Sequence, residues 1–454
     1  MPVSPARAAA FDILRVERES SYASELLHSA TYNHLSTPDH ALATELVMGV
    51  LRWRSRLDDE IAGASSQALT KLDLEILLAL RLATYQFRFL DRIPARAALN
   101  ESVELVKRAR KRSAAPFVNA VLRKISNSQQ TYSTPELSES LVPAVLARAT
   151  AHPAWLVEPW TQKYGLAQAR QICLYDQAVP RTTIRLRTAE VESELLADGI
   201  TLAPGEFLSS ARRVLAGDVT KTRAFHDRRI IIQDEASQLV AALVGGGSNA
   251  RILDCCAAPG GKTLVIADQN PAGKITAVEL HAQRARLLQR LLYSNSSSPA
   301  PASAPVQIVS ADARDLPFST QFNRVLADVP CSGTGTLARN PEIKWRLQPE
   351  NLTEFHERQL AILRSALAQV AHGGRLIYST CSLEKEENED VVEKVLEENS
   401  KFHLLDCRTE LHRLKLSKEL THRDPAMLTR GPYLRTIPGE HHCDGFFAAI
   451  FARA

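Results

Sequence analysis

The sequence predicts an all-α N-terminal region followed by an α/β region with a doubly wound, mostly parallel sheet. Over residues 1 to about 127 glycine is scarce, and apolar residues recur at helical spacing. After residue 250, short apolar runs alternate with helical patterns, which is typical of βαβ units. A chain of 454 residues is also too long for one ordinary core, so we expect more than one domain.

Composition excludes several classes of protein. The hydrophobic fraction of 45% and the charged fraction of 23% are ordinary for a soluble globular protein, and a net charge of +4 does not by itself identify a nucleic-acid partner. Seven cysteines without regular spacing favour a reducing compartment over a disulfide framework. There is no signal-peptide core and no long uncharged apolar run. We therefore expect a cytoplasmic protein without a membrane partner.

The first predicted domain is a helical bundle over residues 1–140. Its helical spacing is seen in two groups of apolar residues: Leu74, Leu77, Leu78 and Leu82, and Met48, Leu51 and Trp53. The polar stretch Ser126–Pro135 is typical of a linker.

The second predicted domain, over residues 141–245, is a linker and a small α+β subdomain that binds RNA. Helices are expected over Trp155–Lys163 and Ala167–Asp176. The run Arg181–Arg187 alternates like a strand and places its arginines on one face.

The third predicted domain, over residues 246–454, contains the parallel sheet. Five short apolar runs are the expected strands: Ile252–Cys255, Ile275–Glu279, Val306–Val309, Val325–Asp328 and Leu376–Ser379. The Ser/Pro/Ala-rich stretch Ser294–Pro305 is expected to be a surface loop.

A cofactor pocket is predicted where the first strand of this sheet ends. In open α/β sheets, ligands bind beyond the carboxyl ends of the strands. The segment after Asp254 contains Gly260 and Gly261, which let the backbone approach a ligand at the start of the next helix. Glu279 follows Gly260 by 19 residues, a spacing typical of a ribose-binding acid, and Asp312 after the third strand is a candidate for an adenine amino group.

Three kinds of nucleotide site compete for this segment. A Walker A loop needs glycine five residues before Gly261, where this chain has Cys256, and the G-x-G-x-x-G fingerprint of dinucleotide sites is absent. Acids at the first three strand ends fit S-adenosylmethionine better. The remaining alternative is a βα turn that needs glycine for its conformation alone.

Two cysteines point to a particular chemistry. Cys331 just follows the fourth strand and Cys381 ends the fifth, so the topology makes them neighbours. A thiolate that adds to C6 of a pyrimidine makes C5 nucleophilic enough to attack a sulfonium methyl group, and a base must then remove the C5 proton. We expect Asp328 between cofactor and base, and Lys262 as the cation that favours a thiolate. A single cysteine is more often a small buried hydrophobe, and we expect this of Cys173, Cys407 and Cys443.

The histidines and cysteines of the sequence do not have the spacing of a metal site. His441, His442 and Cys443 adjoin one another, but the sequence has no second ligand cluster at zinc spacing. We expect no metal.

Three segments resemble the signature motifs of the Nol/Nop/Sun (Fmu) family of RNA cytosine-5 methyltransferases: Asp254–Thr263, Asp328–Gly335 and Tyr378–Ser382. Gln233–Ser237 and Asp444–Phe447 also resemble family segments, and the resemblance covers roughly residues 145–454. The helical N-terminal part resembles NusB-like RNA-binding domains. This order of domains is found in the family's bacterial small-subunit rRNA enzymes.

The resemblance implies roles by position, in a Rossmann-like class I methyltransferase domain. Cys381 matches the nucleophile, and Cys331 matches the cysteine that helps to release the product. The S-adenosylmethionine contacts implied are Cys256, Ala257, Ala258, Pro259, Gly260, Gly261, Lys262, Glu279, Asp312 and Asp328. Two residues depart from the family: Cys255 replaces a more usual apolar residue, and Glu279 stands where Asp is common.

Two groups of basic residues are candidates for phosphate contacts. The first is the run Lys107, Arg108, Arg110, Lys111 and Arg112 near a helix end, which is otherwise a solvated C-terminus stabilised by the helix dipole. The second is the strand with Arg181, Arg185 and Arg187. The target cytosine must leave its stack, so a loop or an opened RNA helix is expected as the substrate.

These observations predict an S-adenosylmethionine-dependent RNA cytosine-5 methyltransferase that acts on 16S rRNA or a small-subunit assembly intermediate. The same chemistry on tRNA is the first alternative, and only the analogy of the NusB-like domain argues against it. A non-catalytic RNA-binding assembly factor is the second, although the two cysteines count against it. A P-loop NTPase is the third.

Overall fold

The computed structural model describes residues 3–16, 22–128, 142–247, 249–293, 303–422 and 424–454. The linker predicted from residue 126 lies outside these residues after Ser128, and so does most of the predicted loop Ser294–Pro305. Contacts divide the chain into two compact units. The helical unit comprises residues 1–179 with 337–347, and the sheet unit comprises residues 180–336 with 348–454. The predicted domain boundaries at 140 and 245 stay a prediction.

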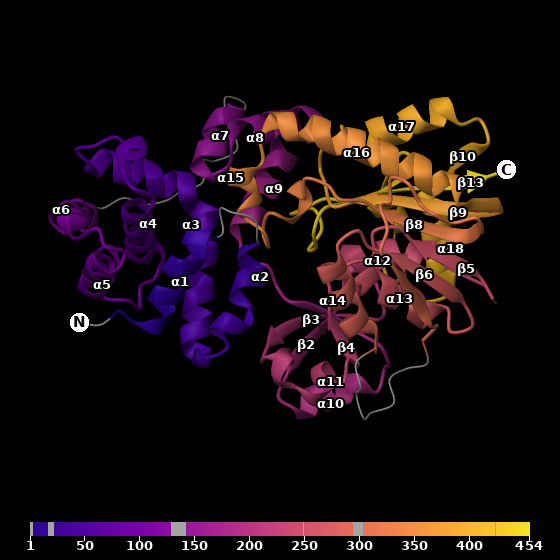
Figure 1. Ribbon diagram of the computed structural model, residues 1–454, viewed down its shortest axis with the longest axis horizontal. Coiled ribbons are helices and arrows are strands. Elements are labelled where there is room, and N and C mark those ends of the chain that lie inside the picture. Colours follow the sequence, from indigo (N-terminus) through magenta and orange to yellow (C-terminus); the bar gives the residue numbers. More distant parts are fainter. Residues whose placement is uncertain (1–2, 17–21, 129–141, 248, 294–302, 423) are drawn as a thin grey trace. The chain divides into compact units, whose positions relative to one another are not determined.

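The helical unit confirms the predicted bundle. Its α-helices, shown in Figure 1, are α1 (Pro5–Val16), α2 (Ala23–Leu27), α3 (Thr37–Ala64), α4 (Leu74–Phe89), α5 (Ala95–Arg108), α6 (Ala115–Ser126), α7 (Pro143–Ala149), α8 (Ala154–Tyr164), α9 (Leu166–Gln177) and α15 (Ile343–Arg346). Leu78 and Leu82 of the predicted helical stripe are buried in the core of α1 to α6, and Leu74 and Leu77 pack against it. The helices predicted from Trp155 and from Ala167 are α8 and α9.

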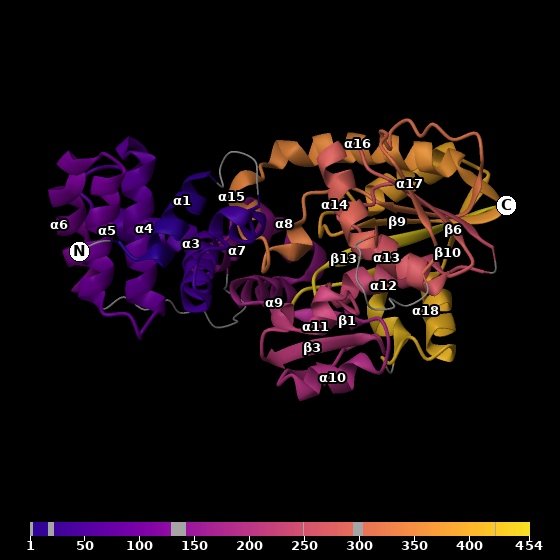
Figure 2. The same cartoon turned by 60° about the horizontal axis from the view of Figure 1, so that its bottom comes forward.

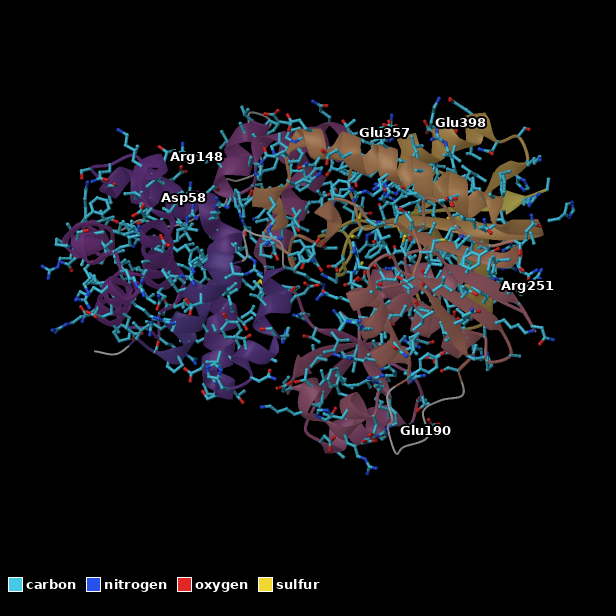
Figure 3. All side chains as sticks on the ribbon, viewed as in Figure 1. Asp58, Arg148, Glu190, Arg251, Glu357 and Glu398 are labelled. Carbon is cyan, nitrogen blue, oxygen red and sulfur yellow. The ribbon has the colours of Figure 1, made fainter. Side chains whose placement is uncertain are left out.

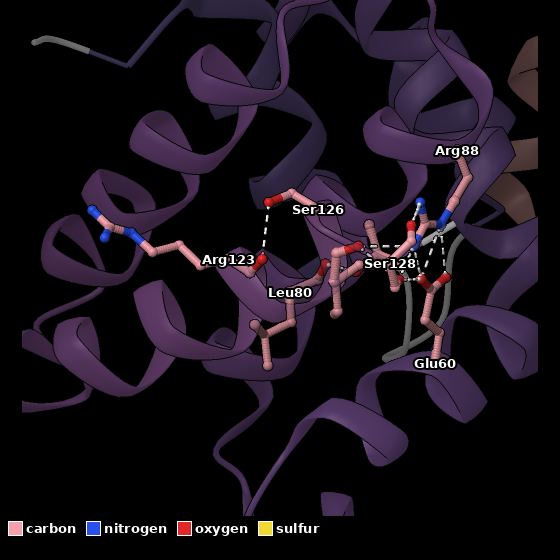
Figure 4. A network of polar contacts seen from close by, with 8 residues as sticks. Glu60, Leu80, Arg88, Arg123, Ser126 and Ser128 are labelled. Atoms are coloured by element: carbon pink, nitrogen blue, oxygen red, sulfur yellow. Dashed lines mark hydrogen bonds and ion pairs between the residues drawn. The ribbon is translucent and has the colours of Figure 1, made fainter. Parts of the chain in front are cut away.

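A polar network joins three helices of this bundle (Figure 4). Glu60 of α3 is 6% exposed, and Arg88 of α4 donates through Nε to Glu60 Oε1 at 2.9 Å. The same guanidinium donates to the carbonyl of Ile125 in α6 at 2.9 Å. A buried acid needs such a partner because desolvation of an unpaired charge costs several kcal/mol.

A short segment from far along the chain completes the helical unit. Residues 337–347, which include α15, belong to this unit and form hydrogen bonds with α3. Lys344 is 1% exposed and its Nζ donates to the carbonyl of Arg52 at 2.9 Å. Trp345 Nε1 donates to the carbonyl of Leu51 at 2.5 Å, and Arg52 Nη2 donates to the carbonyl of Ala338 at 3.1 Å. We name residues 337–347 the inserted segment.

The sheet unit begins with a small antiparallel sheet in the order β2-β3-β1-β4. Its elements are β1 (Thr183–Leu186), α10 (Val191–Ala197), β2 (Thr201–Pro204), β3 (Ala211–Ala216), α11 (Arg223–His226) and β4 (Ile230–Ile232). The strand predicted over Arg181–Arg187 is therefore present as β1. All four of its residues are buried, so it has no exposed face.

The large sheet has the order β11-β12-β13-β9-β8-β5-β6-β7, and β10 pairs with β13. The strands are β5 (Arg251–Asp254), β6 (Lys274–Val278), β7 (Val306–Val309), β8 (Phe322–Asp328), β9 (Val370–Thr380), β10 (Phe402–Leu405), β11 (Thr429–Arg430), β12 (Tyr433–Thr436) and β13 (Phe446–Arg453). The strands β9-β8-β5-β6-β7 are parallel, which confirms the five predicted strands. The antiparallel strands on the β9 side are an addition that the sequence analysis did not predict.

Helices cover both faces of this sheet (Figures 1 and 2). They are α12 (Glu235–Val244), α13 (Gly261–Gln269), α14 (Ala282–Tyr293) and α18 (Cys407–Leu416) on one face, and α16 (Pro349–Ala368) and α17 (Glu389–Glu398) on the other. Successive strand residues point to opposite faces, so Ile252 packs with the first group and Leu253 with the second. Outward side chains such as Glu357 on α16 and Glu398 on α17 are exposed (Figure 3). Among the described residues, no helix is long and apolar enough to cross a bilayer.

Candidate active site

The turn between β5 and α13 needs glycine because it packs closely against leucines of α14. Gly260 has φ +114°, and a Cβ there would lie 2.7 Å from Leu288 Cδ1, so a larger residue would be both strained and crowded. Asp254, at the end of β5, is 1% exposed and accepts a hydrogen bond from Thr263 Oγ1 at 2.7 Å. Burial raises the pKa of Asp254 to about 6.

Acids from neighbouring strands surround this turn. Glu279 directly follows β6, is 5% exposed, and accepts from the backbone N–H of His281 at 2.9 Å. Burial raises the pKa of Cys256, and the charges of Asp254, Asp328 and Glu279 raise it further. Asp312 differs from them because it is bound to the guanidinium of Arg314 at 2.6 Å, which holds the pKa of Asp312 below its usual value.

An ion pair stands between this turn and the cysteines. Lys262 Nζ lies 2.8 Å from Asp328 Oδ2, and the ammonium group lies 4.9 Å from the centre of the Phe446 ring. Burial alone would lower the pKa of Lys262, but the charge of Asp328 and its hydrogen bond raise it overall, and Cys381 adds to the effect. Ser379 donates to Asp328 Oδ1 at 2.7 Å, which orients the carboxylate.

The two predicted cysteines meet. Cys331 Sγ and Cys381 Sγ are 3.3 Å apart, although 50 residues separate them in sequence. Both side chains are partly exposed, and all seven cysteines are free thiols. The hydrogen bond to Cys381, burial, and the charges of Cys381 and Glu387 raise the pKa of Cys331 well above its usual value. The other cysteines that we expected to be structural, Cys173, Cys407 and Cys443, are buried.

Two buried residues that were not predicted from the sequence hold the cysteine loops. The carboxylate of Glu387 is fully buried and accepts from Ser332 and Ser382, the residues that directly follow the two cysteines. Asn388 donates through Nδ2 to the carbonyl of Ser382 at 2.9 Å. The only signal in the sequence was a run of acidic and amide residues after the fifth strand, and such a run is more often solvated.

Backbone contacts join the cysteine loops to a third family-like segment. The N–H of Gly335 donates to the carbonyl of Cys381 at 2.9 Å, and the N–H of Gly445 donates to the carbonyl of Gly335 at 2.7 Å. A Cβ on Gly335 would lie 2.2 Å from the carbonyl oxygen of Gly445, so only glycine allows this approach. The N–H of Asp444 donates to Asp234 Oδ1 at 3.2 Å, which brings the segments Gln233–Ser237 and Asp444–Phe447 together.

The predicted basic residues behave in two ways. In the basic run, Lys107, Arg108 and Lys111 make ion pairs with Glu104, Asp12 and Asp73. Lys107, Arg108, Arg110 and Arg112 are exposed, so they remain accessible to a phosphate.

The second group needs a correction. Arg185 and Arg187 do not form an exposed track, because their side chains are 7% and 4% exposed and both bind the Asp268 carboxylate at 2.6 Å. Strand alternation placed the two arginines on one face, but on that face both guanidinium groups are bound to Asp268 of α13. Arg181, just before β1, is exposed.

The described residues contain no group of three or more His, Cys, Asp or Glu side chains arranged to hold a metal ion. His441 is 3% exposed, and its Nδ1 accepts from the backbone N–H of Ile437 at 3.0 Å. Its role there is to hold the turn before β13.

Known proteins match this chain along nearly its whole length. Residues 242–452 match the family described as 16S rRNA methyltransferase RsmB/F, and residues 4–127 match the NusB family. The probable ribosomal RNA small subunit methyltransferase B of Bacillus subtilis strain 168 is 32% identical over 449 residues, which cover 96% of this chain and 95% of that protein. The protein of the same description from Synechocystis sp. is 32% identical over 469 residues, covering 99% of both chains.

Solved structures match the fold. A crystal structure described as PH0851 has a TM-score of 0.80 at 22% identity and covers 99% of both chains. A methyltransferase homolog protein from Pyrococcus horikoshii has a TM-score of 0.55 at 22% identity, and the match covers 69% of this chain and 100% of that chain. These likenesses confirm the predicted fold class, a helical NusB-like region followed by a mostly parallel methyltransferase sheet. With a relative 32% identical along 95% of its own length, the chain belongs to the 16S rRNA methyltransferase RsmB/F family.

Proposed function

We propose that this protein methylates C5 of a cytosine in 16S rRNA, with S-adenosylmethionine as the methyl donor and Cys381 as a covalent nucleophile. The observation that carries the proposal is the approach of Cys331 Sγ and Cys381 Sγ to 3.3 Å, beside the Lys262–Asp328 ion pair at the carboxyl ends of β8 and β9. Membership of the RsmB/F family and the names of its relatives support the rRNA substrate.

The residues around the β5–α13 turn suit S-adenosylmethionine. Gly261 lies beside Gln233, whose amide nitrogen would be 3.3 Å from a Cβ at the glycine position. The Oε1 of Gln233 is buried without a hydrogen-bond partner among the described residues, so it is available to a bound molecule. Glu279 would accept hydrogen bonds from the ribose, and Asp254, Asp328 and the turn residues 256–262 would complete the site. When bound, the cofactor supplies an electrophilic methyl group on a sulfonium.

The chain's own residues perform the remaining steps. The Cys381 thiolate forms a bond from Sγ to C6 of the cytosine, and the electron pair of the C5–C6 double bond moves so that C5 becomes nucleophilic. Lys262 stabilises the thiolate before attack, and Asp328 is placed to hold the base near N3 and its amino group. After C5 has taken the methyl group, the C5 proton leaves to a base, the C5–C6 double bond re-forms and the bond from C6 to Sγ breaks, which frees Cys381.

Cys331 is proposed as the base in this release step. The largest cause of its raised pKa is the hydrogen bond to Cys381. When Cys381 becomes an uncharged thioether, that interaction is lost and the Cys331 thiol ionises more easily. Its thiolate can then take the C5 proton, so the net reaction converts a C5–H bond to a C5–methyl bond and releases one proton.

Bisulfite sequencing tests the proposal. Purified protein and S-adenosylmethionine are incubated with unmodified 16S rRNA and, separately, with unmodified tRNA. One newly protected cytosine in 16S rRNA is the expected result. Protection in tRNA alone would favour the tRNA alternative, and RNA binding without protection in either substrate would favour a non-catalytic assembly factor.

A further inference from the structure

The cysteine loops share one buried carboxylate that the reaction itself does not use. Glu387 lies in the turn between β9 and α17 and is 0% exposed. Its Oε1 accepts from the backbone N–H of Ser332 at 2.8 Å and from Gln359 Nε2 at 2.9 Å. Its Oε2 accepts from the hydroxyl of Ser382 at 2.5 Å and from the hydroxyl of Ser332. The carboxylate thus has two hydrogen-bond donors on each oxygen.

These contacts connect the two loops at matching positions. Ser332 directly follows Cys331 and Ser382 directly follows Cys381, and the two hydroxyl oxygens are 3.1 Å apart. A side chain that binds both serines fixes the distance between the backbones that carry the cysteines. Its hydrogen-bond donors among the described residues are neutral dipoles, and its negative charge acts on groups nearby.

That charge acts on the thiol of Cys331. Glu387 is among the causes that raise the pKa of Cys331, whereas Cys381 interacts with the cation of Lys262. Two further titratable groups near the pair are Asp328 at the end of β8 and Tyr378 on β9, whose hydroxyl donates to the Glu387 carbonyl at 2.6 Å. Burial raises the pKa of Tyr378 well above its usual value, so that phenol stays neutral.

We propose that Glu387 is a positioning residue, which clamps the Cys331 and Cys381 loops together and by its charge reserves the first, nucleophilic step for Cys381. The assignment of that step rests on the proposed function. The effect on Cys331 is a property of the resting protein and does not depend on it.

Thiol alkylation measures the effect of the charge without RNA or cofactor. The rate of iodoacetamide labelling at Cys331 is followed against pH by peptide mass spectrometry, in a Cys381→Ala background so that the neighbouring thiol does not compete. Adding Glu387→Gln removes the charge and keeps the shape, so labelling of Cys331 should begin at a lower pH, by on the order of one pH unit.

Glu410→Gln is the matched control, because Glu410 is also buried, at 5% exposed, but binds Arg375 and Arg413 on α18's side of the sheet. Its labelling profile should match the background. Superimposable profiles for Glu387→Gln and the background would overturn the proposal.

Two further variants keep the proposal testable if Glu387→Gln does not fold. Ser332→Ala and Ser382→Ala each remove one hydroxyl from the clamp while the charge stays. Each should lower kcat for methyl transfer several-fold with unchanged S-adenosylmethionine affinity, and should leave Cys331 labelling at its high pH. Turnover equal to wild type in both variants would overturn the clamp. If the wild-type protein shows no methylation while the alkylation shift is present, the proposed function is refuted and the proposal for Glu387 is not.

Discussion

Cys331 and Cys381 have different electrostatic surroundings although their sulfur atoms are 3.3 Å apart. Glu387 is among the causes that raise the pKa of Cys331, and Cys381 is among the groups that raise the pKa of Lys262. This asymmetry gives each thiol a distinct expected phenotype when it is removed.

Replacement of the nucleophile should stop the reaction before any bond forms. Cys381→Ala is expected to abolish methyl transfer and to leave S-adenosylmethionine binding nearly intact, because the thiol contacts the base and not the cofactor. A tritiated-methyl assay and calorimetry measure the two effects. Cys173→Ala, which removes a buried thiol of the helical unit, is the matched control and should keep its activity. Near-wild-type turnover of Cys381→Ala would refute the nucleophile assignment.

Replacement of the second cysteine should stop the reaction after methylation. Cys331→Ala is expected to trap the adduct of Cys381 with RNA, because no thiolate remains to take the C5 proton. A denaturing gel should show a shifted protein band that nuclease removes. The double variant Cys331→Ala/Cys381→Ala should lack that band. If Cys331→Ala instead releases methylated RNA at the normal rate, Cys331 has a structural role only.

Glu279 is the acid whose proposed contact is easiest to isolate. Glu279→Ala should weaken S-adenosylmethionine binding by about 1–3 kcal/mol, since it removes charged hydrogen-bond acceptors from the ribose. Calorimetry checks this against Glu357→Ala, an exposed glutamate on α16 (Figure 3), which should bind like wild type. Equal affinities for the two variants would exclude the ribose contact.

The sequence predicted the meeting of Cys331, Cys381, Lys262 and Asp328 because carboxyl ends of parallel strands share one edge of a sheet. Glu387 was beyond this reasoning. Its partner Ser332 is 55 residues away, and an acid in a turn gives no periodic signal of burial. Arg185 and Arg187 were mistaken for surface residues for the same reason, since their counter-charge Asp268 lies 83 and 81 residues further on.

At the scale of elements, one ion-pair cluster fastens the small sheet to the large sheet's helices. Asp268 of α13 forms ion pairs with Arg185 of β1 and with Arg187, which directly follows β1. Burial would raise the pKa of Asp268, but the two guanidinium groups lower it overall. The sequence predicted both elements correctly and could not predict the ion pairs between them, because the pairing is set by the tertiary fold.

This cluster should make the stability of the protein depend on pH. Asp268→Asn is expected to cost about 3–5 kcal/mol at pH 7, because it leaves two buried cations without a counter-charge. A carboxylate with a lowered folded-state pKa stabilises the fold above its unfolded value of about 4, and this contribution is lost as the pH falls through the folded-state value. Urea unfolding should therefore show a smaller difference from wild type at pH 3 than at pH 7. Glu398→Gln, which breaks the exposed pair with Arg364, should change little at either pH. A pH-independent cost for Asp268→Asn would contradict the electrostatic explanation.

The antiparallel strands β10 to β13 were missed because their lengths and spacing do not form a βαβ pattern. β13 is buried along its first six residues, so it has the continuous apolar character of a central strand and no alternation to mark it. Its place beside β9 also sets the site, because Gly445, just before β13, contacts the loop after Cys331.

At the scale of the whole molecule, the basic run belongs to the helical unit and the proposed chemistry to the sheet unit. Changing Lys107, Arg108, Arg110, Lys111 and Arg112 to Ala should raise the RNA dissociation constant and flatten its dependence on salt, because fewer counterions are released. The change should fall on KM for RNA more than on kcat, since these groups would bind ground and transition states alike.

A second five-residue variant controls for the loss of positive charge. It replaces exposed basic residues of the sheet unit, namely Arg251, Lys274, Arg364, Lys394 and Lys401. This variant should keep the wild-type salt slope in a binding titration. Equal slopes for wild type and the Lys107–Arg112 variant would mean that the basic run is only a solvated helix end.

The inserted segment has a consequence for synthesis on the ribosome. Lys344 and Trp345 donate hydrogen bonds to the Arg52 and Leu51 carbonyls of α3, in a unit whose other residues end at 179. Translation proceeds from the N-terminus at about 5–20 residues per second. Roughly ten seconds or longer therefore pass between the synthesis of residue 179 and that of the residues that bind α3. During that interval the nascent helical unit is incomplete, and the surface that later receives residues 337–347 is open to chaperones. The helical unit of this protein therefore finishes folding only when most of the polypeptide has been made.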